Sequence, residues 1–173
     1  MIMDSLEPRD LTHLNAAEGW LGLDNAVEAS AELEKITPAM RAHPEVLKVR
    51  WQICAKAKSW AECVKIAERL VTVAPESAFG WIHRSFALHE LKRTKEALEK
   101  LLPAADFFPD EITIRYNLAC YECVLRNLSR AKIRLAETFK LALNQRCFDQ
   151  WRSQALDDPD LRTLRGFLEE IEI

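Results

Sequence analysis

The chain has 173 residues, of which 49% are hydrophobic and only 4 are glycine, so it can bury one sizeable core and favours helices over a turn-rich β architecture. The formal net charge of −3, with 24 basic residues interspersed among 27 acidic ones, provides no basic field for phosphates and makes nucleic acid a poor partner. The sequence shows no basic, apolar leader and no run of about 18 apolar residues. We therefore expect a cytoplasmic protein without a membrane segment.

Four helix hairpins are predicted along the chain, over residues 8–43, 44–77, 78–111 and 112–145. In the first two, Asn25 with Glu28 and Ser59 with Glu62 have the spacing of a capping box, at the expected start of the second helix. In the third, "ALHELKRTKEALEKLL" indicates a helix end, a polar turn and a helix start. The polar residues thus mark where each second helix begins.

The fourth hairpin and the C-terminal segment carry similar markers. Asn127 is a candidate cap for the second helix of the fourth hairpin. Residues 146–173 are predicted to form a capping segment, in which Asp158 caps a helix and Pro159 takes its first position. Leu161 and Leu164 follow at helical spacing, which indicates an apolar face on that helix.

A period of 34 residues relates the hairpins to one another. Ala97 lies 34 residues after Cys63 and 34 before Ala131. In the first hairpin we align Ala26 with Cys63 at a spacing of 37, which places three extra residues near "TPAMRA". A single hairpin cannot bury both of its apolar faces, so neighbouring hairpins are expected to stack.

In length and residue pattern, residues 8–145 resemble tetratricopeptide repeats. The third hairpin matches the family's aromatic, large, small, large, small, proline order at Trp81, Leu88, Ala97, Leu101, Ala104 and Pro109. Arg84, Ser85 and Trp51 depart from it, the last at a normally small position. The tail "ALDDPDLRTL" resembles the closing segment of some bacterial members. The resemblance implies a single all-α domain, a right-handed α-solenoid of about four antiparallel hairpins with a C-terminal capping helix.

The resemblance also implies a concave wall, formed by the first helix of each hairpin, as the binding surface. Its candidate residues are Lys48, Val49, Gln52, Phe79, Ile82, His83, Phe86, His89, Tyr116, Asn117 and Cys120. Phe79, Ile82 and Phe86 share one helical face, which suits a protein segment with a bulky apolar anchor. The alternative is that the two phenylalanines pack within the chain's own core or against its own tail.

Some members of the family bind the C-terminal carboxylate of heat-shock chaperones through Lys, Asn and Arg side chains at fixed wall positions. Here Lys48 matches, whereas Gln52, His83, Thr113 and Asn117 replace the other members of that set. Without those donors a terminal carboxylate would be poorly paired, so we do not expect this ligand.

The sequence contains no motif for catalysis, a metal or a cofactor. Cys120 and Cys123 form a C-x-x-C pair, but it lies mid-helix without a second ligand pair, which favours packing over redox or zinc chemistry. His83 and His89 lie about 120° apart around one helix and do not share a ligand. Phosphate loops and nucleophile turns are also lacking, so we expect a non-enzymatic protein without a cofactor.

Three classes of function remain open. The first is a scaffold or adaptor that binds a protein or peptide segment. The second is a self-associating structural protein such as a homodimer, with a secretion-type chaperone as a special case. The third is an RNA-binding helical repeat, which the acidic composition disfavours. A mass in solution that falls on dilution would favour self-association.

Overall fold

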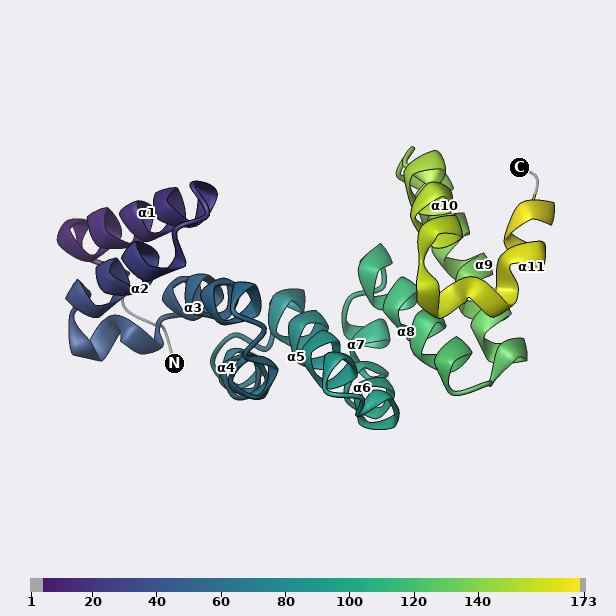
Figure 1. The fold of residues 1–173 in the computed structure, drawn as a ribbon, viewed down its shortest axis with the longest axis horizontal. Helices are drawn as coiled ribbons and strands as arrows, with labels where there is room; N and C mark the ends of the chain where they lie inside the picture. Colours follow the sequence, from purple (N-terminus) through teal and green to yellow (C-terminus); the bar gives the residue numbers. More distant parts are fainter. Residues whose placement is uncertain (1–4, 172–173) are drawn as a thin grey trace. The chain divides into compact units, whose positions relative to one another are not determined.

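The computed structural model of the chain describes residues 5–171, and every regular element in that range is a helix (Figure 1). In chain order the elements, with η for a 3-10 helix, are α1 (Pro8–Gly22), α2 (Ala26–Lys35), η1 (Pro38–Ala42), α3 (Pro44–Lys56), α4 (Trp60–Val73), α5 (Ala78–Glu90), α6 (Thr94–Leu101), α7 (Ala104–Phe107), α8 (Ile112–Val124), α9 (Leu128–Asn144), α10 (Phe148–Asp157), η2 (Pro159–Leu164) and α11 (Arg165–Glu170). The predicted all-α class is confirmed. No helix in the described range is long and apolar enough to cross a membrane.

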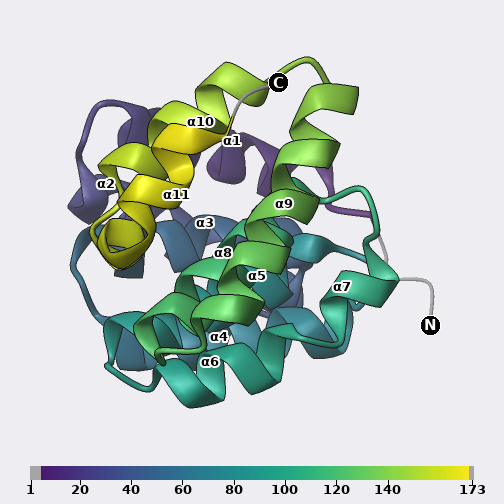
Figure 2. The ribbon, with the colours of Figure 1, turned by 90° about the vertical axis from the view of Figure 1, so that its right-hand side faces the viewer.

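The chain divides into two compact units, which we describe separately. The N-terminal unit comprises described residues 5–87 and the C-terminal unit residues 88–171, so the division falls inside α5. In the N-terminal unit α1 packs against α2 and α3 against α4, and in the C-terminal unit α9 lies alongside α8 (Figure 2). Each packed pair is an antiparallel hairpin of the predicted kind.

The turn inside each of the four hairpins has the same structure and recurs every 34 residues. Asp24, Lys58, Lys92 and Arg126 adopt left-handed backbone conformations, with φ of 60°, 52°, 62° and 66°. The residue after each donates its backbone N–H to the carbonyl five residues earlier, at 2.8–2.9 Å. This is the hydrogen bond that closes a helix C-terminus in the Schellman motif. The period of 34 therefore holds in all four hairpins.

The predicted alignment of Ala26 with Cys63 is wrong. Ala29 is fully buried, as are Cys63, Ala97 and Ala131, and these four residues are spaced by 34. Ala26 is only partly buried. Because the small residue is required where two helices approach closely, burial identifies Ala29 as the equivalent position. With this alignment the first hairpin has no additional residues relative to the second, and its exit segment contains η1.

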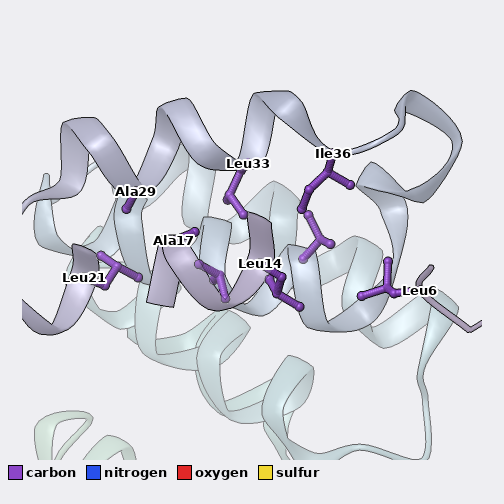
Figure 3. Close-up of a cluster of buried hydrophobic side chains, with 9 residues drawn as sticks. Leu6, Leu14, Ala17, Leu21, Ala29, Leu33 and Ile36 are labelled. Carbon is purple, nitrogen blue, oxygen red and sulfur yellow. The ribbon is translucent and has the colours of Figure 1, made fainter. Parts of the chain in front are cut away.

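The core of the first hairpin combines residues from α1, α2 and α3. It contains Leu6, Leu14, Ala17, Leu21, Ala29, Leu33, Ile36, Val46 and Val49. In Figure 3 the side chains of Leu33 and Ile36 point from the α2 segment toward α1. Asp10 is also buried and accepts hydrogen bonds from the backbone N–H and hydroxyl of Thr37, at 2.9 and 3.1 Å. This carboxylate joins α1 to the segment that precedes η1.

The predicted helix caps are confirmed in part. The Asn25 side chain accepts the backbone N–H of the third residue of α2 at 3.1 Å, as predicted. Ser59 makes no side-chain cap, because the first turn of α4 bonds to its carbonyl instead. Asn127 likewise does not cap α9; its side-chain NH₂ donates to the buried Glu122 carboxylate at 2.7 Å.

The C-terminal capping segment consists of three short helices, α10, η2 and α11. Asp158 caps η2 as predicted, with Pro159 at its first position, and accepts a backbone N–H at 2.9 Å. Leu161, Leu164 and Leu168 are buried, as their helical spacing indicates. The segment η2 packs against α8 within the C-terminal unit.

Candidate functional site

In the N-terminal unit the candidate wall residues come from α3 and α5. Gln52 and Phe86 are exposed, and Lys48 and Ile82 are partly exposed. Val49 is buried in the core of the first hairpin and so lies behind the surface. The surface available to a partner in this unit therefore combines polar side chains on α3 with apolar ones on α5.

An aromatic cluster joins α3 to α5 at this wall. The rings of Phe79 and His83 stack with their centroids 3.7 Å apart and an interplanar angle of 15°. Trp51 meets the His83 ring edge-on at 4.3 Å and the Phe79 ring at 6.0 Å. The Lys48 ammonium lies 5.9 Å from the centre of the Phe79 ring. Trp51, the large residue at a normally small repeat position, is thus the centre of the cluster.

Phe86 forms a second aromatic contact on the same helix, one turn further along. Its ring meets that of Trp60, the first residue of α4, edge-on at 5.6 Å. The Phe86 side chain is nevertheless 38% exposed. Sequence reasoning did not include Trp60 in the wall, because it belongs to the second helix of its hairpin. Phe86 and Trp60 together present a pair of aromatic rings to solvent or to a partner.

A shallow hollow of about 570 Å³ lies between α1 and α3 next to the cluster. It is lined by Glu18, Leu21, Gly22, Trp51, Gln52, Ala55 and Lys56. Lys56 pairs with Asp24 at the hollow's rim, where both side chains are exposed to solvent. The hollow is thus apolar at Leu21, Trp51 and Ala55 and polar at its edge.

In the C-terminal unit the chain's own η2 segment lies on the candidate wall residues. The Tyr116 hydroxyl donates to Asp158 Oδ2 at 2.6 Å, and the Cys120 thiol lies 3.7 Å from the same oxygen. His89 Nε2 lies 2.9 Å from Asp160 Oδ2. Asn117 is partly exposed. Tyr116, Cys120 and His89 are therefore engaged by an internal segment in this unit.

Three of the cysteines, Cys63, Cys120 and Cys123, are buried as packing residues are. Burial raises the pKa of the Cys63 thiol to about 12 and raises the pKa of Cys120 and Cys123. A thiol that stays protonated is a poor nucleophile and a poor metal ligand. Among residues 5–171, no group of three or more His, Cys, Asp or Glu residues is placed to hold a metal ion.

The repeated hairpins and the 34-residue period of their turns are those of the tetratricopeptide type of helical-repeat fold. No family model matches the chain, and no curated protein shows significant similarity to it. Several solved structures, in contrast, are similar to it. The MamA RS-1 ArsTM double mutant has a TM-score of 0.70 at 16% identity, over 80% of this chain and 79% of that one.

Two further structures show the same likeness. MamA MSR-1 C2 has a TM-score of 0.66 at 14% identity, over 79% of this chain and 78% of its own. TTC0263, a thermophilic TPR protein in Thermus thermophilus, has a TM-score of 0.62 at 17% identity, over 94% of this chain and 100% of its own. At these identities the similarity establishes the fold alone. The candidate wall residues are the basis for inferring a function.

Proposed function

We propose that the protein is a non-enzymatic interaction scaffold, and that the wall of its N-terminal unit binds a segment of a partner protein. The observation that carries this proposal is the 38% exposure of Phe86 beside Trp60, on the helix face where this type of fold presents its wall. Aromatic side chains at such positions supply much of the binding energy in protein contacts. The partner segment would place a bulky apolar side chain against this aromatic pair.

The C-terminal unit supports the proposal by example. There a wall helix, α8, already packs against a short helical segment, η2, through Tyr116 and buried leucines. Wall helices of this sequence are therefore able to accept a short helix by combining apolar burial with a few hydrogen bonds. In the N-terminal unit the corresponding positions include the exposed Gln52 and Phe86.

The experiment is affinity capture from native lysate with the wild-type chain, Phe86→Asp and the control Phe107→Asp. Phe107 is 65% exposed and belongs to α7, which is not a wall helix. Loss of an aromatic anchor costs about 2 kcal/mol or more, roughly a thirtyfold loss of affinity. We expect a protein retained by the wild type and Phe107→Asp but lost by Phe86→Asp, at unchanged helical content. Capture of the same proteins by all three would contradict the proposal.

Self-association is the second candidate function, favoured by a different surface. Leu23 and Val27 flank the turn of the first hairpin and are 73% and 77% exposed. Exposed apolar side chains are found at protein contacts where they form a patch. Sedimentation of the wild type and of Leu23→Ser, Val27→Ser over a range of concentrations tests this. A mass that falls on dilution only for the wild type would support it, and a concentration-independent monomer would reject it.

A further inference from the structure

A hydrogen bond to the Phe79 carbonyl determines which ring nitrogen of His83 carries the proton. His83 Nδ1 lies 2.9 Å from the Phe79 carbonyl oxygen, one helical turn earlier. A carbonyl oxygen has no hydrogen and only accepts, so Nδ1 must be the donor. Burial lowers the pKa of His83 below its ordinary value of 6.5. At neutral pH the ring is therefore uncharged, and Nε2 carries an unprotonated lone pair.

Within residues 5–171, no donor is bonded to Nε2 of His83, whose hydrogen bond is made through the other ring nitrogen. A contrast is provided by His89, whose two nitrogens contact Thr94 and Asp160 at 3.0 and 2.9 Å. His83 therefore has one hydrogen-bonding position that the described chain does not use.

The same cluster contains an unused donor. Trp51 is 6% exposed, and its indole N–H is buried without an acceptor among the described residues. Leaving such a group unpaired costs about 1–3 kcal/mol, and buried polar groups in native proteins are nearly always paired. Trp51 also lines the hollow between α1 and α3. Two adjoining rings of one wall thus each have a polar atom that the described chain leaves unpaired, one an acceptor and one a donor.

We propose that His83 is a specificity-determining residue of the N-terminal wall and accepts a hydrogen bond from a hydroxyl or carboxamide side chain of the partner segment. This inference rests on the proposed function and adds to it the chemistry of the ligand. A hydroxyl or carboxamide donates a hydrogen bond, so it can pair with the unused Nε2 of His83. An ionised carboxylate only accepts and would face the lone pair of Nε2. The wall therefore discriminates against a carboxylate at this place.

The test uses peptides selected from a phage-displayed library of random short sequences on the immobilised wild-type chain at neutral pH. Selected peptides are synthesised with each donor removed in turn, by Ser→Ala, Thr→Val, Asn→Leu or Tyr→Phe exchange. Their affinities are measured for the wild type and for His83→Phe, which keeps a ring to stack on Phe79 and removes the acceptor. The four measurements form a double-mutant cycle between the peptide donor and Nε2.

We expect one donor whose removal weakens binding about tenfold on the wild type and leaves binding to His83→Phe unchanged, as for a single buried hydrogen bond. If no donor couples to position 83 while Phe86→Asp still abolishes binding, the inference is wrong and the proposed function stands. If the peptides bind Phe86→Asp as well as the wild type, or none is selected, both are wrong. Selected peptides that depend on a terminal carboxylate would also overturn the inference.

Discussion

Gly80 provides the sharpest test of the packing that positions the wall. A Cβ atom at this residue would lie 2.9 Å from the Val71 backbone nitrogen and 3.0 and 3.1 Å from the Cβ and carbonyl carbon of Leu70. These contacts are shorter than van der Waals distance, and two of the three atoms are backbone, so α4 and α5 would have to move apart. Gly80→Ala therefore combines a gain in helix propensity of about 1 kcal/mol with an overpacking cost of about 1–3 kcal/mol.

Gly19→Ala is the matched control, because Gly19 also lies in a helix but has no such neighbour. Apart from adjacent residues and its own helix backbone, the described chain places no heavy atom within 4 Å of its added Cβ. We expect Gly19→Ala to raise the free energy of unfolding by about 1 kcal/mol. The free energy of unfolding of Gly80→Ala should be lower than that of Gly19→Ala by about 1–3 kcal/mol. Urea unfolding followed by circular dichroism measures both. Equal stabilities would refute the close approach of α4 and α5.

Three further predictions concern buried polar groups. Asp10→Ala should lower the free energy of unfolding by about 1–3 kcal/mol, because it removes the two hydrogen bonds that the buried Asp10 carboxylate accepts from Thr37; urea unfolding checks this, and an unchanged midpoint would contradict it. The lowered pKa of His83 means that the unfolded chain protonates first, so its contribution to stability is complete above pH 6.5 and is lost as the pH falls below it. The stability of His83→Phe should lack that component of the pH dependence. Identical profiles of stability against pH for the wild type and His83→Phe would contradict this prediction. Tyr116→Phe should speed proteolysis near Asp158, because it removes the 2.6 Å hydrogen bond; equal cleavage rates would show that this bond does not hold the segment.

The repeat was predictable because it depends on local chemistry. The turn residues recur at the same offset from hairpin to hairpin, and each closes its helix with bonds inside a few positions. The first hairpin was misaligned because Ala26 and Ala29 both satisfy the small-residue pattern. The 34-residue spacing favours Ala29, and its burial against the opposite helix identifies it as the equivalent position.

The candidate site was predictable only as a set of positions on the first helices. The cap at Asp158 follows from local sequence, but the bond of its other carboxylate oxygen to Tyr116 joins residues 42 positions apart. The cluster around Trp51 likewise depends on the contact between α3 and α5. That a tryptophan occupied a normally small position was the one sequence feature that indicated an unusual wall there. The unused nitrogen of His83 can be recognised only in the three-dimensional structure.

The most direct test of the central claim places a photo-crosslinking amino acid at position 86 and, as a control, at position 107, and irradiates each chain in native cell extract. The claim predicts a crosslinked foreign protein at position 86, mapped to a segment with an apolar anchor, and none of that protein at position 107. A crosslink at position 86 only to a second copy of the chain, or the same products at both positions, would contradict the claim that this wall binds a partner segment.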